Sequence, residues 1–334
     1  MTTLKEKLYQ MFILGTEGGG YLEGLKHGLG GVIFFTKDIQ TTEQFKTLIK
    51  EIKRVSLISP FLSIDQEGGR VERTENIHNG KKYLSAKYAF EKGADYLSNQ
   101  TQKIAQELKS YGINLNFAPC IDTNTNPNNP IIGERAFSSN PDEVIIGEKI
   151  VSNIYRNNKI IPCVKHFPGH GDTNSDSHLT LPEITIPLNK MEKTHLKPFK
   201  AAIENGADMV MVAHIHCECF EKEPTPTSLS KNTIDYLRNK LNYNGVIISD
   251  DMIMKGVSSF GETQAALMAI NAGINILIYR NSNQNTINII DNIYQKAIID
   301  KELQNKINIS YEKIINLKTK YLIINSGEHI NETK

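Results

Sequence analysis

Short apolar runs recur along the chain, and segments with helical spacing of their apolar positions separate most of them. Each run is five or six residues long, which suits a buried β-strand, and the intervening segments are long enough for amphipathic helices. A strand followed by a helix, repeated along the chain, predicts a parallel sheet covered by helices. The predicted strands are 10–14, 31–35, 61–65, 113–118, 160–164, 209–213, 246–250 and 274–278, and the helical segments include 42–55, 84–111, 143–157 and 190–205.

Eight strand–helix units in 334 residues predict an α/β fold of the closed (β/α)₈ type, the TIM barrel, as a single domain. An open doubly wound sheet is the alternative. It requires a glycine-rich phosphate turn after an early strand, and the glycines at 18–20 are interpreted as lacking that strand–turn–helix setting. Residues 287–322 are predicted to be helical and to pack on the barrel exterior, and residues 326–334 to form a disordered tail.

Polar residues just past the carboxyl ends of the strands form the active site of such a barrel. Five of the predicted strands end in or before ionisable residues, which predicts that these residues meet in one pocket. They are Asp65 after the third run, the 122–135 loop after the fourth, the 165–178 segment after the fifth, His214 after the sixth, and Asp250 and Asp251 after the seventh.

The 165–178 segment is especially rich in ionisable side chains, with one Lys, three His and two Asp in fourteen residues. Asp176 stands two residues before His178, so in an extended loop its carboxylate can accept a hydrogen bond from the imidazole. A carboxylate neighbour favours the imidazolium and fixes its tautomer. This arrangement suits a general acid that protonates a leaving group.

Two further groups of residues suit a hydroxylated ligand. Asp65 and Arg73 flank a pair of glycines, and Arg135 follows an Asn- and Pro-rich loop; the alternative for each Arg is a surface ion pair. Adjacent strand residues face opposite sides, so at most one of Asp250 and Asp251 is expected to point into the barrel mouth. Both could instead cap the following helix.

Composition narrows the function further. The net charge of +1 gives no electrostatic basis for binding nucleic acid or an anionic membrane. The four Cys show no disulfide spacing, the N-terminus lacks the apolar core of a signal peptide, and no apolar run approaches the ~18 residues of a membrane span. A cytoplasmic protein with a small-molecule partner is therefore expected, as a monomer or weak homo-oligomer.

The cluster of His214, His216, Cys217 and Cys219 holds good zinc ligands. Its spacing is too compact for a closed site, whose ligand pairs are usually well separated, so no metal site is predicted. His214, at a strand end, is expected to line the pocket.

Four motifs, in order, resemble glycoside hydrolase family 3, and most closely its single-domain bacterial β-N-acetylglucosaminidases. The resemblance extends from about residue 11 to 256 and makes residues 1–325 the catalytic domain. The chain departs from relatives at 215–219 and 252–255. Both segments are expected at the pocket rim, so the resemblance predicts the reaction more firmly than it predicts which leaving group is preferred. The motifs are 65–71, 126–137, 165–178 and 249–252.

The resemblance implies a retaining exo-hydrolase that removes terminal β-linked N-acetylglucosamine. In relatives, the residue matching Asp250 attacks the anomeric carbon, that matching His178 acts as acid and then base, and that matching Asp176 orients the His. A mobile loop brings this His in, and Gly169 and Gly171 are hypothesised to be its hinge. The implied role is cytoplasmic cell-wall recycling, on N-acetylglucosamine linked to 1,6-anhydro-N-acetylmuramic acid with or without peptide, with no metal or organic cofactor. The sugar-binding residues implied are Asp65, Arg73, Arg135, Lys165 and His166.

Four alternatives stay open. Some relatives with an Asp-x-His pair transfer the sugar to phosphate, and phosphate dependence would reveal such a phosphorylase. β-Glucosidase relatives are usually longer and take their acid/base from another domain or loop. In a substrate-assisted hexosaminidase the acetamido group attacks, Asp250 and Asp251 act as a pair, and His178 is dispensable. A non-catalytic sugar-binding protein would not need Asp176, His178 and Asp250 together.

Overall fold

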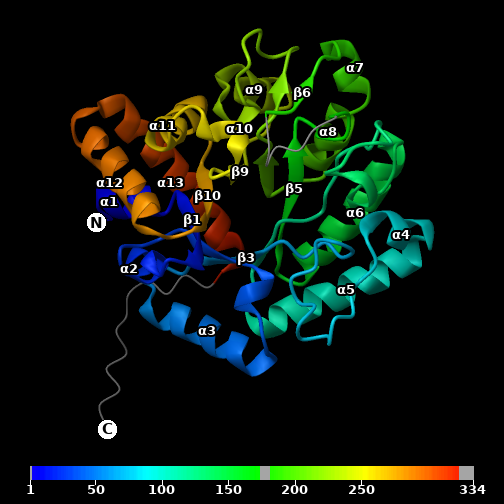
Figure 1. The fold of residues 1–334 in the computed structure, drawn as a ribbon, viewed down its shortest axis with the longest axis horizontal. Helices are drawn as coiled ribbons and strands as arrows, with labels where there is room; N and C mark the ends of the chain where they lie inside the picture. The colour runs from blue at the N-terminus through cyan, green and yellow to red at the C-terminus, as the bar shows by residue number, and fades with distance from the viewer. Residues whose placement is uncertain (1, 174–180, 323–334) are drawn as a thin grey trace.

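The computed structural model describes residues 2–173 and 181–322 of the chain. Asp176, His178 and the tail predicted at 326–334 lie outside the described residues. Within them, eight parallel strands close into a barrel that is surrounded by helices (Figure 1). The predicted (β/α)₈ barrel is therefore confirmed, and the open doubly wound sheet is excluded.

All eight apolar runs form barrel strands. Each strand pairs with the next barrel strand along the chain, and the last pairs with the first, in the order β1-β10-β9-β7-β5-β4-β3-β2. A separate two-stranded sheet joins β6 (Glu183–Ile184) to β8 (His216–Cys217). The barrel strands are β1 (Phe12–Glu17), β2 (Gly31–Phe34), β3 (Phe61–Ile64), β4 (Leu115–Asn116), β5 (Ile161–Phe167), β7 (Met209–Val212), β9 (Val246–Asp251) and β10 (Ile276–Asn281).

The predicted helical segments are present, and two of them are divided. Segment 84–111 breaks at Gly93, whose φ of +100° does not fit a helix, and segment 190–205 breaks before Leu196. The helices are α1 (Leu4–Tyr9), α2 (Gly20–Lys26), α3 (Thr42–Val55), α4 (Ala86–Glu91), α5 (Ala94–Tyr111), α6 (Pro141–Asn157), α7 (Leu188–Lys193), α8 (Leu196–Glu204), α9 (Lys231–Asp235), α10 (Lys255–Ser258), α11 (Glu262–Ala272), α12 (Gln284–Ile299) and α13 (Lys301–Tyr321). Short helical turns are η1 (Thr36–Asp38), η2 (Gly133–Arg135), η3 (Thr227–Leu229) and η4 (Tyr236–Lys240).

The C-terminal helical segment consists of α12 and α13, which meet at Asp300. The Asp300 carboxylate caps α13 by accepting hydrogen bonds from the backbone N–H groups of Glu302 (2.9 Å) and Leu303 (3.0 Å). Helix α13 packs against α1, α11 and the outer side of β9. The predicted position on the barrel exterior is therefore confirmed.

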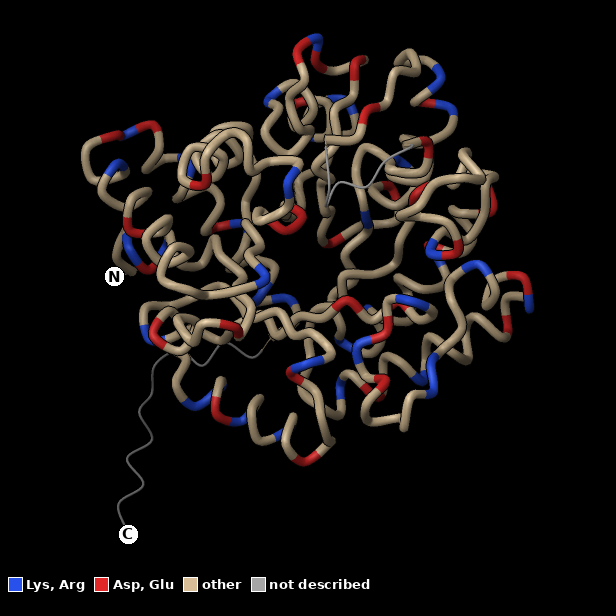
Figure 2. Tube along the Cα trace, viewed as in Figure 1, with Lys and Arg blue, Asp and Glu red and all other residues tan. Residues whose placement is uncertain are grey.

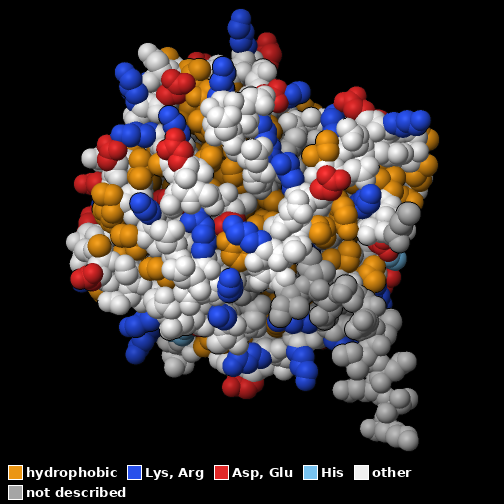
Figure 3. All heavy atoms as spheres, turned by 180° about the vertical axis from the view of Figure 1, so that it is seen from behind, with side chains coloured by type: hydrophobic (Ala, Val, Ile, Leu, Met, Phe, Trp, Pro, Cys, Tyr) orange, Lys and Arg blue, Asp and Glu red, His pale blue; other side chains and the backbone are white. Residues whose placement is uncertain are grey.

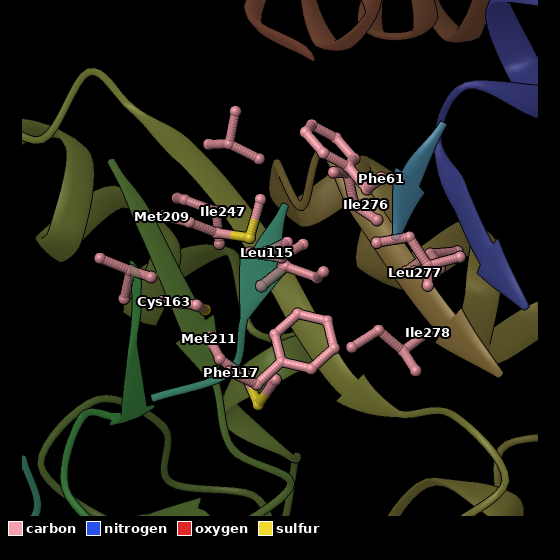
Figure 4. Close-up of a cluster of buried hydrophobic side chains, with 14 of the residues drawn as sticks. Phe61, Leu115, Phe117, Cys163, Met209, Met211, Ile247, Ile276, Leu277 and Ile278 are labelled. Carbon is pink, nitrogen blue, oxygen red and sulfur yellow. The ribbon is translucent and has the colours of Figure 1, made fainter. Parts of the chain in front are cut away.

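Buried apolar side chains from different strands fill the inside of the barrel, among them Phe61, Cys163 and Ile247 (Figure 4). The barrel is thus a packed core and not a channel. Phe117, Met211 and Ile278 belong to this core and also line a cavity above it. They give the cavity an apolar floor.

Gly18 and Gly19 lie between β1 and α2, and Gly20 begins α2, so the interpretation that the glycines at 18–20 lack a strand–turn–helix setting is wrong. Gly18 and Gly20 pack closely where the barrel closes. A Cβ at Gly18 would lie 2.7 Å from Asn283 Cα, and one at Gly20 would lie 2.4 Å from the Ser282 carbonyl oxygen. Only glycine lets this turn approach the backbone that follows β10 so closely.

Acidic and basic residues are interspersed over the outer helices (Figure 2). The opposite face of the molecule likewise mixes charged and hydrophobic side chains (Figure 3). In the described parts of the chain, no helix combines the length and apolarity needed to cross a bilayer.

Candidate active site

A cavity of about 210 Å³ opens above the apolar floor and is lined by residues from several strand ends. The chain segments that contribute are far apart in sequence, so the prediction that strand ends converge on one pocket is confirmed. Asp176 and His178 cannot be placed in it, because they lie outside the described residues. Six of the predicted site residues line the cavity together: Asp65, Arg73, Arg135, Lys165, His166 and Asp250.

Strand β5 runs on to Phe167, beyond the end predicted at position 164, so Lys165 and His166 are strand residues and not loop residues. Between Val164 and Phe167, β5 carries one residue more than the facing part of β7. Such a bulge interrupts the alternation of side chains and redirects one of them. It accounts for the finding that the adjacent Lys165 and His166 both line the cavity.

Glu67 is a buried carboxylate that holds two cations in the cavity wall. Arg135 donates to it from Nε (2.9 Å) and from Nη2 (2.8 Å), and Lys165 Nζ lies 2.5 Å from Oε1. Lys165 also donates to Asp65 Oδ1 at 2.7 Å. Burial alone would raise the pKa of Glu67, but the charges of Arg135 and Lys165 outweigh burial and hold it below its usual range. Arg135 and Lys165 are therefore fixed as charged donors.

Asp122 is a second buried carboxylate, and it orients His166. It accepts hydrogen bonds from His166 Nδ1 (2.7 Å) and the His166 backbone N–H (3.1 Å), and from the His170 backbone N–H (2.6 Å). Burial would raise the pKa of Asp122, but the neighbouring His166 and His170 hold it well below its usual range. On the other side of the ring, His166 Nε2 lies 3.3 Å from Arg135 Nη2.

The adjacent carboxylates of Asp250 and Asp251 both line the cavity, which differs from the expectation that one at most faces the mouth. Strand β9 carries one residue more than β10 between Ile248 and Asp251, so a bulge again breaks the alternation. The two carboxylates are bonded differently. Asp251 Oδ1 accepts from the backbone N–H groups of Ile253 and Arg280, each at 3.2 Å, whereas Asp250 accepts only from the N–H of Asp251 (2.7 Å) among the described residues.

Electrostatics also separate the two carboxylates. Burial acts to raise the pKa of Asp250, but the charges of His166 and His214 outweigh it and lower that pKa, so Asp250 is a carboxylate at neutral pH. Burial raises the pKa of Asp251 to about 6 against the opposing charge of Arg280. Asp250 is therefore the better candidate for a nucleophile, and Asp251 is tied into the backbone at the end of β9.

His214 is buried beneath this strand end and is not among the residues that line the cavity, so its expected place in the pocket wall is wrong. Its Nδ1 lies 2.6 Å from Ser228 Oγ and its Nε2 lies 3.1 Å from the Asp251 carbonyl oxygen. The imidazole thus contacts the end of β9 through the Asp251 carbonyl oxygen.

His170 also lines the cavity, although sequence reasoning assigned it no role. The Thr173 hydroxyl donates to the His170 carbonyl (3.0 Å), so its oxygen accepts from His170 Nδ1 at 2.8 Å. The remaining nitrogen, Nε2, is buried and has no partner among the described residues. Burial lowers the pKa of His170 to about 4, so at neutral pH Nε2 presents a lone pair to a ligand hydroxyl.

Lowering the pH from 7 to 4 is expected to destabilise the protein by about 3 kcal/mol through His170 alone. The unfolded imidazole takes up a proton near 6.5 and the folded one only near 4, so this stability is present above pH 6.5 and is lost as the pH falls. Urea unfolding of wild type and His170→Gln at both pH values measures the effect. The same carboxylates titrate in both proteins, so their contribution cancels in the comparison. An equal loss of stability in wild type and variant would contradict the assignment of the effect to His170.

Gly169 and Gly171 are closely packed, which leaves the hinge hypothesis without support from their surroundings. A Cβ at Gly169, whose φ is +122°, would lie 2.6 Å from His195 Cβ, and one at Gly171 would lie 1.8 Å from the Thr123 carbonyl oxygen. Substituting these glycines therefore tests packing and not hinge motion.

Gly171→Ala is expected to destabilise the fold by roughly 1–3 kcal/mol, because the added methyl group forces the Thr123 backbone away. Thermal and urea unfolding measure the loss. Gly24→Ala in α2 is the matched control: its Cβ would meet nothing closer than 3.5 Å, so its stability should be unchanged or slightly higher. Similar losses in both variants would show that close packing at Gly171 is not what requires glycine.

Cys120, Asp122 and His166 are the only three His, Cys or acidic side chains in the described parts of the chain whose ligand atoms lie within 4.8 Å of one another. Burial raises the pKa of the Cys120 thiol, which donates to Asp122 at 3.2 Å. The Asp122 oxygens already accept from His166 and His170. The geometry is that of a hydrogen-bond network, and His214, His216, Cys217 and Cys219 form no such group.

The residues that sequence reasoning missed are mainly the buried carboxylates. Glu67 lies two positions after Asp65 in a motif that was recognised, and Asp122 lies in the loop after β4. Both are acidic residues in short polar stretches that follow strands, and this was the only sign in the sequence that they belong to the site. Which cation each one holds could not be inferred from that signal.

The fold and the cavity define the class: a (β/α)₈-barrel enzyme whose strand-end carboxylates and fixed cations surround a pocket for a hydroxylated ligand. Residues 3–317 match the family described as Glycosyl hydrolase family 3 N terminal domain. The chain belongs to this family, which confirms the resemblance seen in its motifs.

Individual relatives and a solved structure are consistent with this family. Beta-hexosaminidase A of Pseudoalteromonas piscicida is 32% identical over 323 residues, covering 88% of this chain but 54% of that protein. Beta-hexosaminidase of Psychromonas ingrahamii is 32% identical over 299 residues, covering 88% of each. The structure of a glycoside hydrolase family 3 beta-N-acetylglucosaminidase from Paenibacillus sp. str. FPU-7 superposes with a TM-score of 0.87 at 28% identity, covering 99% of this chain and 66% of that one. The chain thus spans about half of the first relative and most of the second.

Proposed function

We propose that this chain is an exo-acting β-N-acetylglucosaminidase that hydrolyses terminal β-linked N-acetylglucosamine with retention of configuration. The observation that carries the proposal is the position of the Asp250 carboxylate, which lines a cavity of about 210 Å³ and accepts only from the N–H of Asp251 among the described residues. This volume lies below the ~300 Å³ of pockets for drug-sized ligands and suits one sugar ring. The names of the beta-hexosaminidase relatives agree with this activity.

In the proposed reaction, an Asp250 oxygen attacks the anomeric carbon while His178 protonates the departing glycosidic oxygen. This forms a glycosyl ester on Asp250 and releases the aglycone. His178, now neutral, takes a proton from water, which attacks the anomeric carbon and frees Asp250. The roles of His178 and Asp176, which would orient it, rest on the motif because both lie outside the described residues.

The sugar is proposed to be held by the charged groups of the cavity wall. Lys165 and Arg135 offer donors that Glu67 keeps charged, and Asp65 offers an acceptor. Arg73 lies with its guanidinium 5.7 Å from the Phe35 ring centroid, and its buried Nε has no partner among the described residues. His166, with its ring fixed by Asp122, completes the set. A hydroxylated ring would satisfy these groups together.

For the aglycone we propose 1,6-anhydro-N-acetylmuramic acid, with or without peptide, and a role in peptidoglycan recycling in the cytoplasm by a monomer or weak homo-oligomer. Arg280 supports this choice, because it lines the cavity with a half-exposed side chain and its Nε lies 3.4 Å from Asp251. A guanidinium there suits the lactyl carboxylate of a muramic acid. Domain bounds of 1–325 stay a prediction.

The function is tested by release of N-acetylglucosamine from a chromogenic N-acetyl-β-glucosaminide and from the anhydromuramic disaccharide, each with and without phosphate. Phosphate-independent release of the free sugar is expected. Release that requires phosphate, with a sugar phosphate as product, would replace the hydrolase by a phosphorylase. A marked preference for a β-glucoside would replace it by a β-glucosidase.

His178→Ala tests the acid/base role through the leaving group. Removal of a general acid is expected to lower the rate on the disaccharide by ~10²–10⁴, and to slow glycosyl-enzyme formation far less with an activated nitrophenyl leaving group, which departs without protonation. Pre-steady-state release of nitrophenol separates this step from the second. Equal losses on both substrates would contradict the role of His178 as general acid, and near-normal turnover would favour the substrate-assisted mechanism.

A further inference from the structure

Two cysteines that take no part in the cavity lie in contact at the end of β8. Their sulfur atoms are 3.3 Å apart. Cys217 is the last residue of β8 and is 1% exposed, whereas Cys219 is partly exposed in the turn that follows. The backbone N–H of Phe220 bonds to the Cys217 carbonyl oxygen at 3.0 Å and closes this turn. The turn holds the two thiols side by side without any long-range rearrangement.

We propose that Cys217 and Cys219 form a reversible redox site, which a low-molecular-weight disulfide oxidises to an intramolecular disulfide bond. The geometry supplies what such a site requires: two sulfur atoms in contact, one reachable from solvent and one behind it. The two cysteines belong to the cluster of zinc-type ligands whose spacing predicts no metal site, and the proposed hydrolase reaction does not use them.

The two thiols differ in a way that orders the reaction. A hydrogen bond from the Cys217 thiol lowers the pKa of Cys219 against the effect of burial. The same hydrogen bond and burial raise the pKa of Cys217. Cys219 is also the more exposed of the two, so it is the thiolate that meets the oxidant, and the buried Cys217 is the resolving thiol.

The reaction balances as two thiol–disulfide exchanges. The Cys219 thiolate attacks one sulfur of the small disulfide, forms a mixed disulfide and releases one small thiolate. That thiolate takes up the proton which Cys217 loses as it attacks the Cys219 sulfur and displaces the second small thiolate. The two protein thiols are oxidised to a disulfide, and the small disulfide is reduced to one thiol and one thiolate, which takes up from solvent the proton that Cys219 lost when it ionised.

The other two cysteines serve as an internal comparison. Cys163 is fully buried in the barrel core (Figure 4), and burial raises the pKa of its thiol. Cys120 is 2% exposed and donates to Asp122. Buried protonated thiols react slowly with disulfides, so native protein should lose two of its four thiols and no more.

Oxidation is also expected to weaken the pairing between β8 and its neighbour β6. The residue enclosed by the new ring is Glu218, whose backbone N–H donates to the Ile184 carbonyl oxygen at 3.0 Å. Closing the disulfide changes the backbone at Glu218 and weakens this bond. Amide hydrogen exchange at Glu218 is therefore expected to be faster in the oxidised protein, and unchanged exchange would overturn this coupling.

The test uses the full-length native protein with oxidised glutathione, followed by acid quench, alkylation under denaturing conditions and peptide mass analysis. Two of the four thiols should become unavailable, with a disulfide inside the peptide that holds Cys217 and Cys219, and dithiothreitol should restore both. Cys217→Ser should instead retain one glutathionyl group on Cys219, and Cys219→Ser should stay unmodified. All four thiols remaining in the wild type, or a stable glutathionyl adduct on Cys219 while Cys217 is present, would overturn the proposal.

Discussion

Replacing Asp250 by Asn is expected to lower kcat on an N-acetyl-β-glucosaminide by a factor on the order of 10⁴ or more. The amide carries no negative charge and cannot form the glycosyl ester on which a retaining reaction depends. The fold should survive, because the Asn side-chain oxygen can still accept from the Asp251 N–H, as Asp250 Oδ1 does at 2.7 Å. Steady-state kinetics and circular dichroism on the same preparation separate lost chemistry from lost folding.

Asp251→Asn is the matched control one residue along the same strand. Its side-chain oxygen can still accept from the Ile253 and Arg280 N–H groups, which Asp251 Oδ1 holds at 3.2 Å. A loss of no more than about tenfold is expected, because this carboxylate supports the strand end and does not form the ester. An active Asp250→Asn, or an Asp251→Asn that loses as much, would mean that the nucleophile has been assigned to the wrong residue.

Glu67→Gln is expected to destabilise the protein by roughly 3–5 kcal/mol, the usual effect of removing one partner from a buried ion network. It leaves Arg135 without its buried counter-charge and Lys165 with Asp65 alone. A lower kcat/KM should accompany the loss, because both cations face the proposed sugar. Urea unfolding gives the free energy, and kinetics are measured well below the midpoint so that folded protein is compared.

The pH dependence provides a second readout for Glu67. The folded pKa of Glu67 is depressed, so its stabilising effect is present above its ordinary value of 4.5 and is lost as the pH falls below it. Glu67→Gln should therefore lose less stability on acidification than wild type.

Glu91→Gln in α4 is the control for charge removal. The Glu91 carboxylate is exposed and lies 3.9 Å from Lys87 Nζ, so a change within about 0.5 kcal/mol is expected. Equal effects in the two variants would show that Glu67 is no more than a surface charge.

The sequence alone determined the barrel and the set of strand ends that form the site. Eight apolar runs separated mostly by helical patterns suffice for this, because a run must be buried and a helical pattern between two runs must cover the sheet. The strands converge on one mouth as a consequence of being parallel. Asp65, Arg135, Lys165 and Asp250 could thus be placed together before any contact was known, and they line one cavity.

The tertiary structure alone decided how those side chains are aimed and charged. The bulges in β5 and β9 turn adjacent residues toward the same cavity, and they exist only in relation to the register of β7 and β10. Likewise, Glu67 and Asp122 became the anchors of Arg135 and His166 only through contacts between distant segments. Register and burial are properties of strands packed against one another, so the pKa values of the site, and the difference between Asp250 and Asp251, arise only in the folded chain.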